Sequence, residues 1–177
     1  CSALSNELVI PETCKIIGDG AFSQCENLRI NTLPQSITSI GYRAFSFCEN
    51  VNVDINLPNL EKLTNGAFYG AGVTSVVNLG RLTSLKNDVF RGCKNLTFVE
   101  LPETLTEIGI HIFYSDSALE TIKINAVYPP TMGSPAFDGT PSTLSIYVPD
   151  ESVDTYKSAT NWSQYADKIK PLSEYQE

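Results

Sequence analysis

The stretch IPETCKIIGDGAFSQCENL, Ile10–Leu28, is followed by LPQSITSIGYRAFSFCENV, Leu33–Val51, and the two agree at most apolar positions. The phenylalanine that closes the Ile-Gly-x-x-Ala-Phe element of each stretch recurs along the chain at steps of 23, 23, 22, 23 and 24 residues. The members of this register are Phe22, Phe45, Phe68, Phe90, Phe113 and Phe137. A constant period of this length indicates a chain built from repeated structural units that stack on one another.

Two further registers keep the same period. An apolar residue follows each register phenylalanine by six positions at Leu28, Val51, Leu96 and Leu119, and Val73 stands one position earlier. A proline after an apolar residue recurs at Pro11, Pro34, Pro58 and Pro102, and Gly80 replaces it once. No single unit of this size buries its apolar residues alone, so the pattern predicts a repeat solenoid whose layers share one core.

Each unit is expected to contain one short strand. The segment 96–101 has the L-x-x-L-x-L spacing of a leucine-rich repeat strand, and so does 119–124. Alternation places Val99 and Leu101 inside and Glu100 outside. Pro102 cannot donate a hydrogen bond to a sheet, so it ends the strand. The fold class predicted is therefore a solenoid of units of about 23 residues with short parallel strands.

The repeat array is expected to cover residues 1–149, and a C-terminal cap residues 150–177. The segment 1–11 matches 25–34, which indicates that the first unit is truncated. After the last strand, the segment 150–168 loses strand alternation and is expected to be helical, with Asp150 as N-cap. Its apolar residues are expected to cover the last layer, because an open end would expose core and strand edges. They are Val153, Tyr156, Trp162, Tyr165 and Ile169.

The five cysteines are interpreted mainly through the repeat. Cys25, Cys48 and Cys93 each follow a register phenylalanine by three positions, where another unit has Ala71. A position shared by cysteine and alanine favours a small buried thiol over a disulfide or a metal ligand. Cys1 is the end of a truncated repeat or, alternatively, a lipid-modified N-terminal cysteine; the match through Pro11 favours the first.

Composition and motifs exclude several classes of function. The net charge of -8 and the scattered basic residues disfavour binding to nucleic acid. No apolar run approaches the roughly 20 residues that span a bilayer, so no membrane insertion is expected from this segment. The single histidine, His111, has no metal-binding spacing around it, and no phosphate-binding or nucleophile motif occurs. Neither an enzyme nor a cofactor, metal or catalytic residue is predicted.

The motifs quoted above resemble the BspA-like branch of the leucine-rich repeats, which occurs in bacterial surface antigens and some protist surface proteins. The family repeat, I-P-x-x-V-x-x-I-G-x-x-A-F-x-x-C-x-x-L, is followed closely by 10–28 and 33–51, and YVPDESVDTYKSATNWSQYADKIKPL is similar to its usual cap. This chain departs from the pattern at Thr64, Lys86, Gly80 and Asp116. The resemblance implies a secreted or cell-surface protein that binds host proteins or other cells, and it implies no reaction.

A candidate binding face follows from the strand pattern. Each layer has one outward-facing position just before the last apolar residue of its strand, and these positions should form a row across the strands. They are occupied by Thr32, Asn56, Asn78, Glu100, Lys123 and Tyr147. Phe98, at a normally exposed strand position, is either an aromatic contact for a ligand or packed on a neighbouring layer. Two functions remain open: a monomeric adhesion module for a protein or glycan of a host or neighbouring cell, and a structural spacer that presents another domain.

Overall fold

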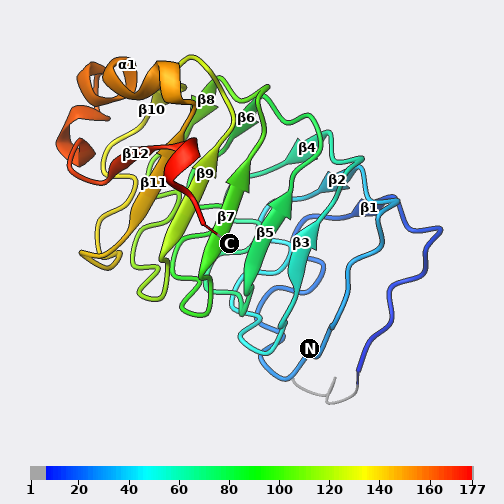
Figure 1. Cartoon of the computed structure of the whole chain (residues 1–177). Helices are drawn as coiled ribbons and strands as arrows, with labels where there is room; N and C mark the ends of the chain where they lie inside the picture. Colours follow the sequence, from blue (N-terminus) through cyan, green and yellow to red (C-terminus); the bar gives the residue numbers. More distant parts are fainter. Residues whose placement is uncertain (1–6, 177) are drawn as a thin grey trace.

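The computed structural model describes residues 7–176, which coil into stacked layers with a parallel sheet along one side (Figure 1). The six-stranded sheet has the order β3-β5-β7-β9-β11-β12. Its strands are β3 (Asp54–Asn56), β5 (Ser75–Asn78), β7 (Phe98–Leu101), β9 (Thr121–Ile124), β11 (Ser145–Val148) and β12 (Ile169–Pro171). Each neighbouring pair is parallel. The predicted repeat solenoid with short parallel strands is confirmed.

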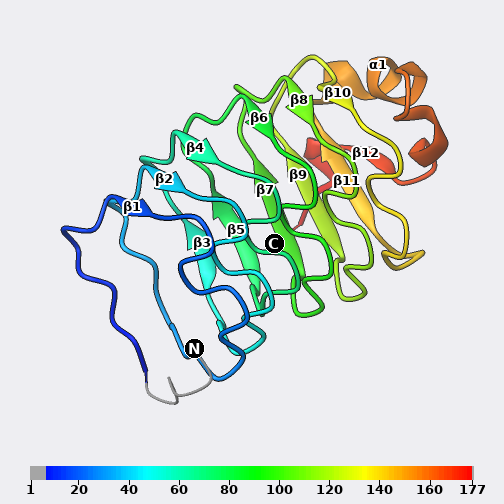
Figure 2. The same ribbon diagram turned by 180° about the vertical axis from the view of Figure 1, so that it is seen from behind.

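A second side of each layer carries a two-residue strand just before the Gly-x-x-Ala-Phe turn. These strands form two parallel sheets of three, and each strand buries its second residue. The first sheet holds β1 (Ile16–Ile17), β2 (Ser39–Ile40) and β4 (Lys62–Leu63); the second holds β6 (Ser84–Leu85), β8 (Glu107–Ile108) and β10 (Thr131–Met132). Figure 2, seen from the opposite side, shows them in front of the long sheet. The sequence pattern predicted the turn but not these strands.

The register phenylalanines form one ladder through the core. Successive ring centroids lie 5.2, 5.3, 5.6, 5.8 and 5.9 Å apart, and the ring planes are inclined by 3 to 17°. From Phe45 to Phe137 these side chains are buried, and Phe22 at the N-terminal end is half-buried. Each ring therefore contacts its counterparts in the layers above and below, as the period predicts.

The turns that hold these rings also stack in register. Two positions after each register phenylalanine the backbone is left-handed, at Gln24, Phe47, Gly70, Gly92, Ser115 and Gly139. From Gln24 to Ser115, the backbone N–H groups at these positions donate to the next layer. That of Phe47 donates to the Tyr69 carbonyl at 2.7 Å, and that of Gly92 to the Tyr114 carbonyl at 2.9 Å. Side chains of successive turns are thereby held in line along the outside of the solenoid.

The cysteines divide into two groups. Cys48 and Cys93 are buried free thiols, and their Sγ atoms donate to the carbonyls of Phe22 and Phe68 at 2.9 and 3.1 Å. Cys14 is free and half-buried. Cys25 is disulfide-bonded, so the expectation of a buried thiol is wrong at this position. The alternatives for Cys1 lie outside the described residues.

The cap has less helix than the sequence predicted. Within 150–168 there is a single six-residue α-helix, α1 (Val153–Ser158), flanked by the 3-10 turns η1 (Asp150–Ser152) and η2 (Ser163–Tyr165). Pro149, not Asp150, occupies the first N-cap position, and the Asp150 carboxylate instead accepts a hydrogen bond from the Ser173 N–H at 3.0 Å. The helix ends at Ser158, and the chain then turns so that Trp162 and Tyr165 are buried.

Those large side chains close the last layer as expected. Trp162 lies with its ring centroid 6.0 Å from that of Phe137, at the end of the phenylalanine ladder. Its indole N–H donates to the Pro130 carbonyl at 2.8 Å, and the Tyr156 hydroxyl donates to the Ala126 carbonyl at 2.7 Å. Their polar atoms are thus satisfied despite complete burial. Strand β12 then pairs with β11 and covers the edge of the sheet.

Within residues 7–176, no helix has the length and apolar character needed to cross a membrane.

Candidate binding surfaces

The candidate binding face lies on the outer side of the six-stranded sheet. Glu100 is paired with Lys123, and Lys123 with Tyr147, so three of its side chains stand at one register on β7, β9 and β11. Asn56 and Asn78 are likewise paired on β3 and β5. The row is broken between these two groups, because the register shifts after Ile55 and an extra exposed residue, Val77, precedes Asn78. Thr32 is exposed and lies outside the strands.

Several polar groups of this face are engaged with one another. The Lys123 ammonium lies 3.6 Å from the Glu100 carboxylate, whose other oxygen accepts a hydrogen bond from the Asn125 amide at 2.9 Å. An ion pair that is already formed must be broken or shared before a ligand can use either charge. The candidate binding face on the strands, here called the strand face, therefore offers fewer free polar groups than its sequence indicates.

The C-terminal segment also lies on this face. The Tyr175 ring contacts Tyr147, with centroids 5.2 Å apart, and Phe98, at 6.3 Å. It also receives the Lys123 ammonium at 4.9 Å from its centroid. Figure 1 shows this segment in front of the sheet, and Figure 2, from the opposite side, shows it behind. Phe98 thus packs against the tail, a contact that neither of its two sequence interpretations anticipated.

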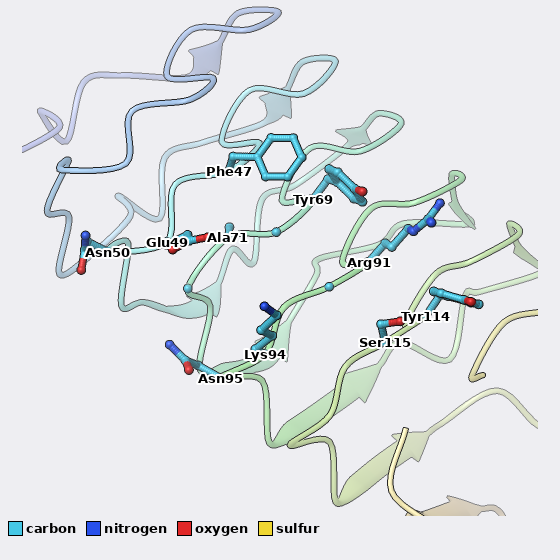
Figure 3. Close-up of a pocket in the computed structure, with 13 residues that line it drawn as sticks. Phe47, Glu49, Asn50, Tyr69, Ala71, Arg91, Lys94, Asn95, Tyr114 and Ser115 are labelled. Atoms are coloured by element: carbon cyan, nitrogen blue, oxygen red, sulfur yellow. The ribbon is translucent and has the colours of Figure 1, made fainter. Parts of the chain in front are cut away.

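A second surface, hollowed into the turns, was missed by the sequence interpretation. It is a groove of about 440 Å³, which we call the turn groove. Phe47, Tyr69, Arg91 and Tyr114 follow one another along one side, and Lys94 and Asn95 lie on the other (Figure 3). The four residues of the first side come from successive layers, because the turns stack in register, whereas Lys94 and Asn95 belong to the layer of Arg91.

A shortened turn opens the groove. Val73 follows Phe68 by five positions, whereas Val51 and Leu96 follow their phenylalanines by six. The short turn contains Gly70 and Gly72, which line the groove without side chains. A Cβ atom at Gly72 would lie 2.2 Å from the Glu49 carbonyl oxygen, so the two backbones approach too closely for any other residue. The groove floor is therefore backbone.

The row Phe47, Tyr69, Arg91 and Tyr114, here called the aromatic–arginine row, is held by contacts between its own members. The rings of Phe47 and Tyr69 meet edge to face, with centroids 4.8 Å apart. The Arg91 guanidinium carbon lies 5.5 Å from the Tyr69 centroid and 4.9 Å from that of Tyr114. A guanidinium between two rings is favourably placed, because its charge faces the electron-rich ring surfaces while its edge remains free to donate hydrogen bonds.

Asp88 and His111, which lie behind the aromatic–arginine row, hold Arg91 in place. Asp88 accepts a hydrogen bond from one Arg91 Nη at 3.1 Å, and the same oxygen lies 3.4 Å from the Nδ1 of His111. The His111 ring in turn meets Tyr114 edge to face at 5.2 Å. The only histidine of the chain thus packs against the row. Residues 7–176 contain no cluster of three or more metal-ligating side chains.

A buried carboxyl group lies one residue beyond Ser115, which lines the groove. Asp116 stands at the cysteine position of its repeat and is fully buried. Burial raises its pKa to about 9, so the carboxyl is protonated at neutral pH. One of its oxygens accepts a hydrogen bond from the Cys93 N–H at 2.8 Å. Asp116 does not face solvent and is part of the core rather than of the groove.

The architecture and the sequence now agree on one family. The sequence model of one protein family, the BspA type leucine rich repeat region, matches residues 1–88 and 61–165 and finds six copies of the repeat. The chain belongs to the BspA-type leucine-rich repeat family. No curated protein matches it. Among solved structures, a leucine-rich repeat protein from Bacteroides ovatus aligns with 94% of this chain at 21% identity and a TM-score of 0.39; this chain spans 60% of that protein's chain.

Within this BspA-type array, the turn groove left a weak signal in the sequence. Positions just after the register phenylalanine hold large side chains in four successive layers, namely Phe47, Tyr69, Arg91 and Tyr114. The single step of 22 residues marks the shortened turn. Both features are visible in the sequence, but only the stacking of the turns in register makes these residues neighbours.

Proposed function

We propose that this BspA-type chain is a non-enzymatic recognition module of a secreted or cell-surface protein, monomeric and bacterial in origin, that binds a protein or glycan of a host or neighbouring cell. The observation that supports it is the regular stacking of exposed side chains on a continuous core. The ladder from Phe22 to Phe137 holds every layer, and half-buried groups such as Tyr69 and Arg91 stand in successive layers outside it. Repeat proteins bind partners through extended surfaces of this kind.

Pre-organisation is the physical advantage of such a surface. Side chains that are already held by neighbours lose little conformational freedom when a partner binds. Arg91 is held by Tyr69, Tyr114 and Asp88 before any ligand arrives. A partner therefore meets a surface whose side chains are already in place.

Binding of the purified chain to a panel of extracellular matrix proteins and a glycan array tests the proposal. We expect saturable binding to at least one member. We also expect a weakening of about tenfold or more, equal to about 1.4 kcal/mol, when one of the two surfaces is altered. One variant carries Glu100→Ala, Lys123→Ala and Tyr147→Ala; a second carries Lys94→Glu. Absence of saturable binding, or binding that neither variant changes, would contradict a recognition role.

The second candidate is a structural spacer that holds another domain away from the cell. It is favoured by the ion pair between Glu100 and Lys123 and by the Tyr175 ring that lies on Lys123, since both occupy groups a ligand would use. A spacer predicts that neither surface variant alters attachment of the full-length protein to its partners. The same binding measurements therefore separate the two functions.

A further inference from the structure

The turn groove is separate from the strand face and its residues have unused bonding capacity. Asp88 engages one Nη of Arg91, and the structure gives no hydrogen-bond partner among residues 7–176 for the remaining guanidinium donors. Lys94 and Asn95 are exposed, and within the same range neither makes an ion pair or a side-chain hydrogen bond. The groove therefore presents free donors next to aromatic surface.

The composition of the groove is that of a surface for polypeptide recognition. Aromatic residues and arginine are enriched where proteins bind proteins, and tyrosine, serine, glycine and asparagine predominate in antibody binding loops. The turn groove combines these types: its lining includes Tyr69, Tyr114, Arg91, Asn95 and Ser115, with glycine in the floor. Its volume of about 440 Å³ accommodates side chains of a short extended segment rather than a whole domain.

The charge of the groove selects the kind of segment. The chain carries a net charge of -8, yet the lining holds two cations, Arg91 and Lys94, and one carboxylate, Glu49. Asp88, behind the row, pairs with one Nη of Arg91, so Lys94 is the cation of the lining that has no ion-pair partner among residues 7–176. Glu49 belongs to the layer of Phe47, whereas Arg91 and Lys94 share the layer beyond the short turn. An acidic side chain is therefore attracted to the Arg91 end and repelled from the Glu49 end. An apolar side chain fits the Phe47 and Tyr69 rings at that other end.

Phe47 adds an independent indication of use. Its backbone has a φ of 59°, in the left-handed region, and its side chain is 38% exposed. A bulky residue pays a strain energy there that glycine avoids. The equivalent positions of the other layers hold Gln24, Gly70, Gly92, Ser115 and Gly139, so Phe47 is the large apolar side chain of this set. The ring packs on Tyr69 outside the core, so core packing does not account for the strain, and its exposed part is available as an aromatic contact for a ligand.

We propose that the turn groove binds an extended peptide segment of a partner protein, with an acidic side chain at Arg91 and Lys94 and an apolar side chain against Phe47 and Tyr69. This inference rests on the proposed recognition function and assigns it to the turns rather than to the strand face. The fixed arginine supplies a planar pair of donors for the carboxylate.

Selection of a random peptide library displayed on phage against the immobilised chain tests the proposal. The enriched sequences are expected to share an aspartate or glutamate next to an aromatic or aliphatic residue. A synthetic copy of the strongest peptide should lose affinity by about tenfold or more with Lys94→Glu, and again when its acidic residue is changed to the amide. Gly92→Asn should also weaken binding, because asparagine tolerates a left-handed φ and places a side chain at the groove.

The matched control is Arg81→Glu, which makes the same charge change at an exposed residue outside the groove. It should change affinity by no more than about twofold. Peptides without a shared acidic residue, or equal losses with Lys94→Glu and Arg81→Glu, would overturn the inference. Groove-dependent binding to a neutral glycan instead of a peptide would overturn it too. Saturable binding that depends only on Glu100, Lys123 and Tyr147 would reject the groove but leave the recognition function standing.

Discussion

The ammonium of Lys123 lies 4.9 Å from the ring centroid of Tyr175, so a residue of the C-terminal segment rests on the outer face of the sheet. The same ring contacts Tyr147 on the neighbouring strand. The segment thereby ties the cap to β9 and β11, and it occupies part of the face that the repeat pattern indicates as a binding surface. The turn groove, in contrast, carries no such cover from residues 7–176.

The substitution Tyr175→Ala should lower the free energy of unfolding by about 1–2 kcal/mol. It removes the cation–π contact with Lys123 and the edge-to-face contact with Tyr147. Urea denaturation followed by circular dichroism measures this. Tyr128→Ala is the matched control, since that side chain is 82% exposed and should cost less than about 0.5 kcal/mol. Equal costs for the two variants would show that the tail does not rest stably on the sheet.

The phenylalanine ladder gives a second prediction. Phe68 is fully buried between Phe45 and Phe90, at ring distances of 5.3 and 5.6 Å. Phe68→Ala leaves a cavity in the middle of the array and should cost about 3–5 kcal/mol in unfolding free energy. Phe22→Ala, at the half-buried end of the ladder, should cost clearly less. Denaturant midpoints of the two variants provide the comparison, and similar losses would contradict a shared continuous core.

This ladder is the part of the fold that the sequence predicts best. Burial of a phenylalanine at each repeat is a constraint that every layer must satisfy, so it leaves a periodic signal. The same holds for the cap, where Trp162 and Tyr156 are large residues after the last strand and do cover the final layer. Apolar periodicity is sufficient to predict the burial of these residues. Each phenylalanine packs against the equivalent residue of the next layer, and the cap residues pack against the last layer.

Other features depend on geometry that periodicity does not carry. The helix expected over 150–168 is reduced to the six residues of α1, because packing of Trp162 and Tyr165 on the last layer overrides helix propensity. Cys25 occupies the position of the buried thiols yet is disulfide-bonded, which spacing alone does not distinguish. The turn groove depends on a residue missing from one turn and on side chains of four layers, so no single repeat contains its signal.

Phe47 provides a third prediction, in which stability and binding diverge. Phe47→Gly removes the edge contact with Tyr69 but relieves a left-handed backbone strain of about 1–2 kcal/mol. The two effects offset each other, so the unfolding free energy should change by less than about 1 kcal/mol. Affinity for a groove-binding peptide should nevertheless fall by about tenfold, as titration calorimetry would measure. A large loss of stability would show that this ring is structural.

Asp116 gives the last prediction, through the dependence of stability on pH. Burial raises its folded-state pKa to about 9, well above the value of an exposed aspartate, so the folded protein holds a proton that the unfolded chain releases near pH 4. Its contribution to stability is therefore fully present below about pH 4 and is lost as pH rises toward 9. Between pH 5 and 8 the unfolding free energy should fall with a slope of up to about 1.4 kcal/mol per unit.

Asp116→Asn keeps the acceptor for the Cys93 N–H but carries no ionisable proton. This variant should be more stable than the native chain at pH 8, by a margin that grows steadily from pH 5 upward, as urea denaturation at each pH would measure. Glu103→Gln, an exposed carboxylate changed in the same way, should leave the slope unaltered. Parallel pH profiles for the native chain and the Asn variant would place the proton elsewhere and remove Asp116 as the source of the effect.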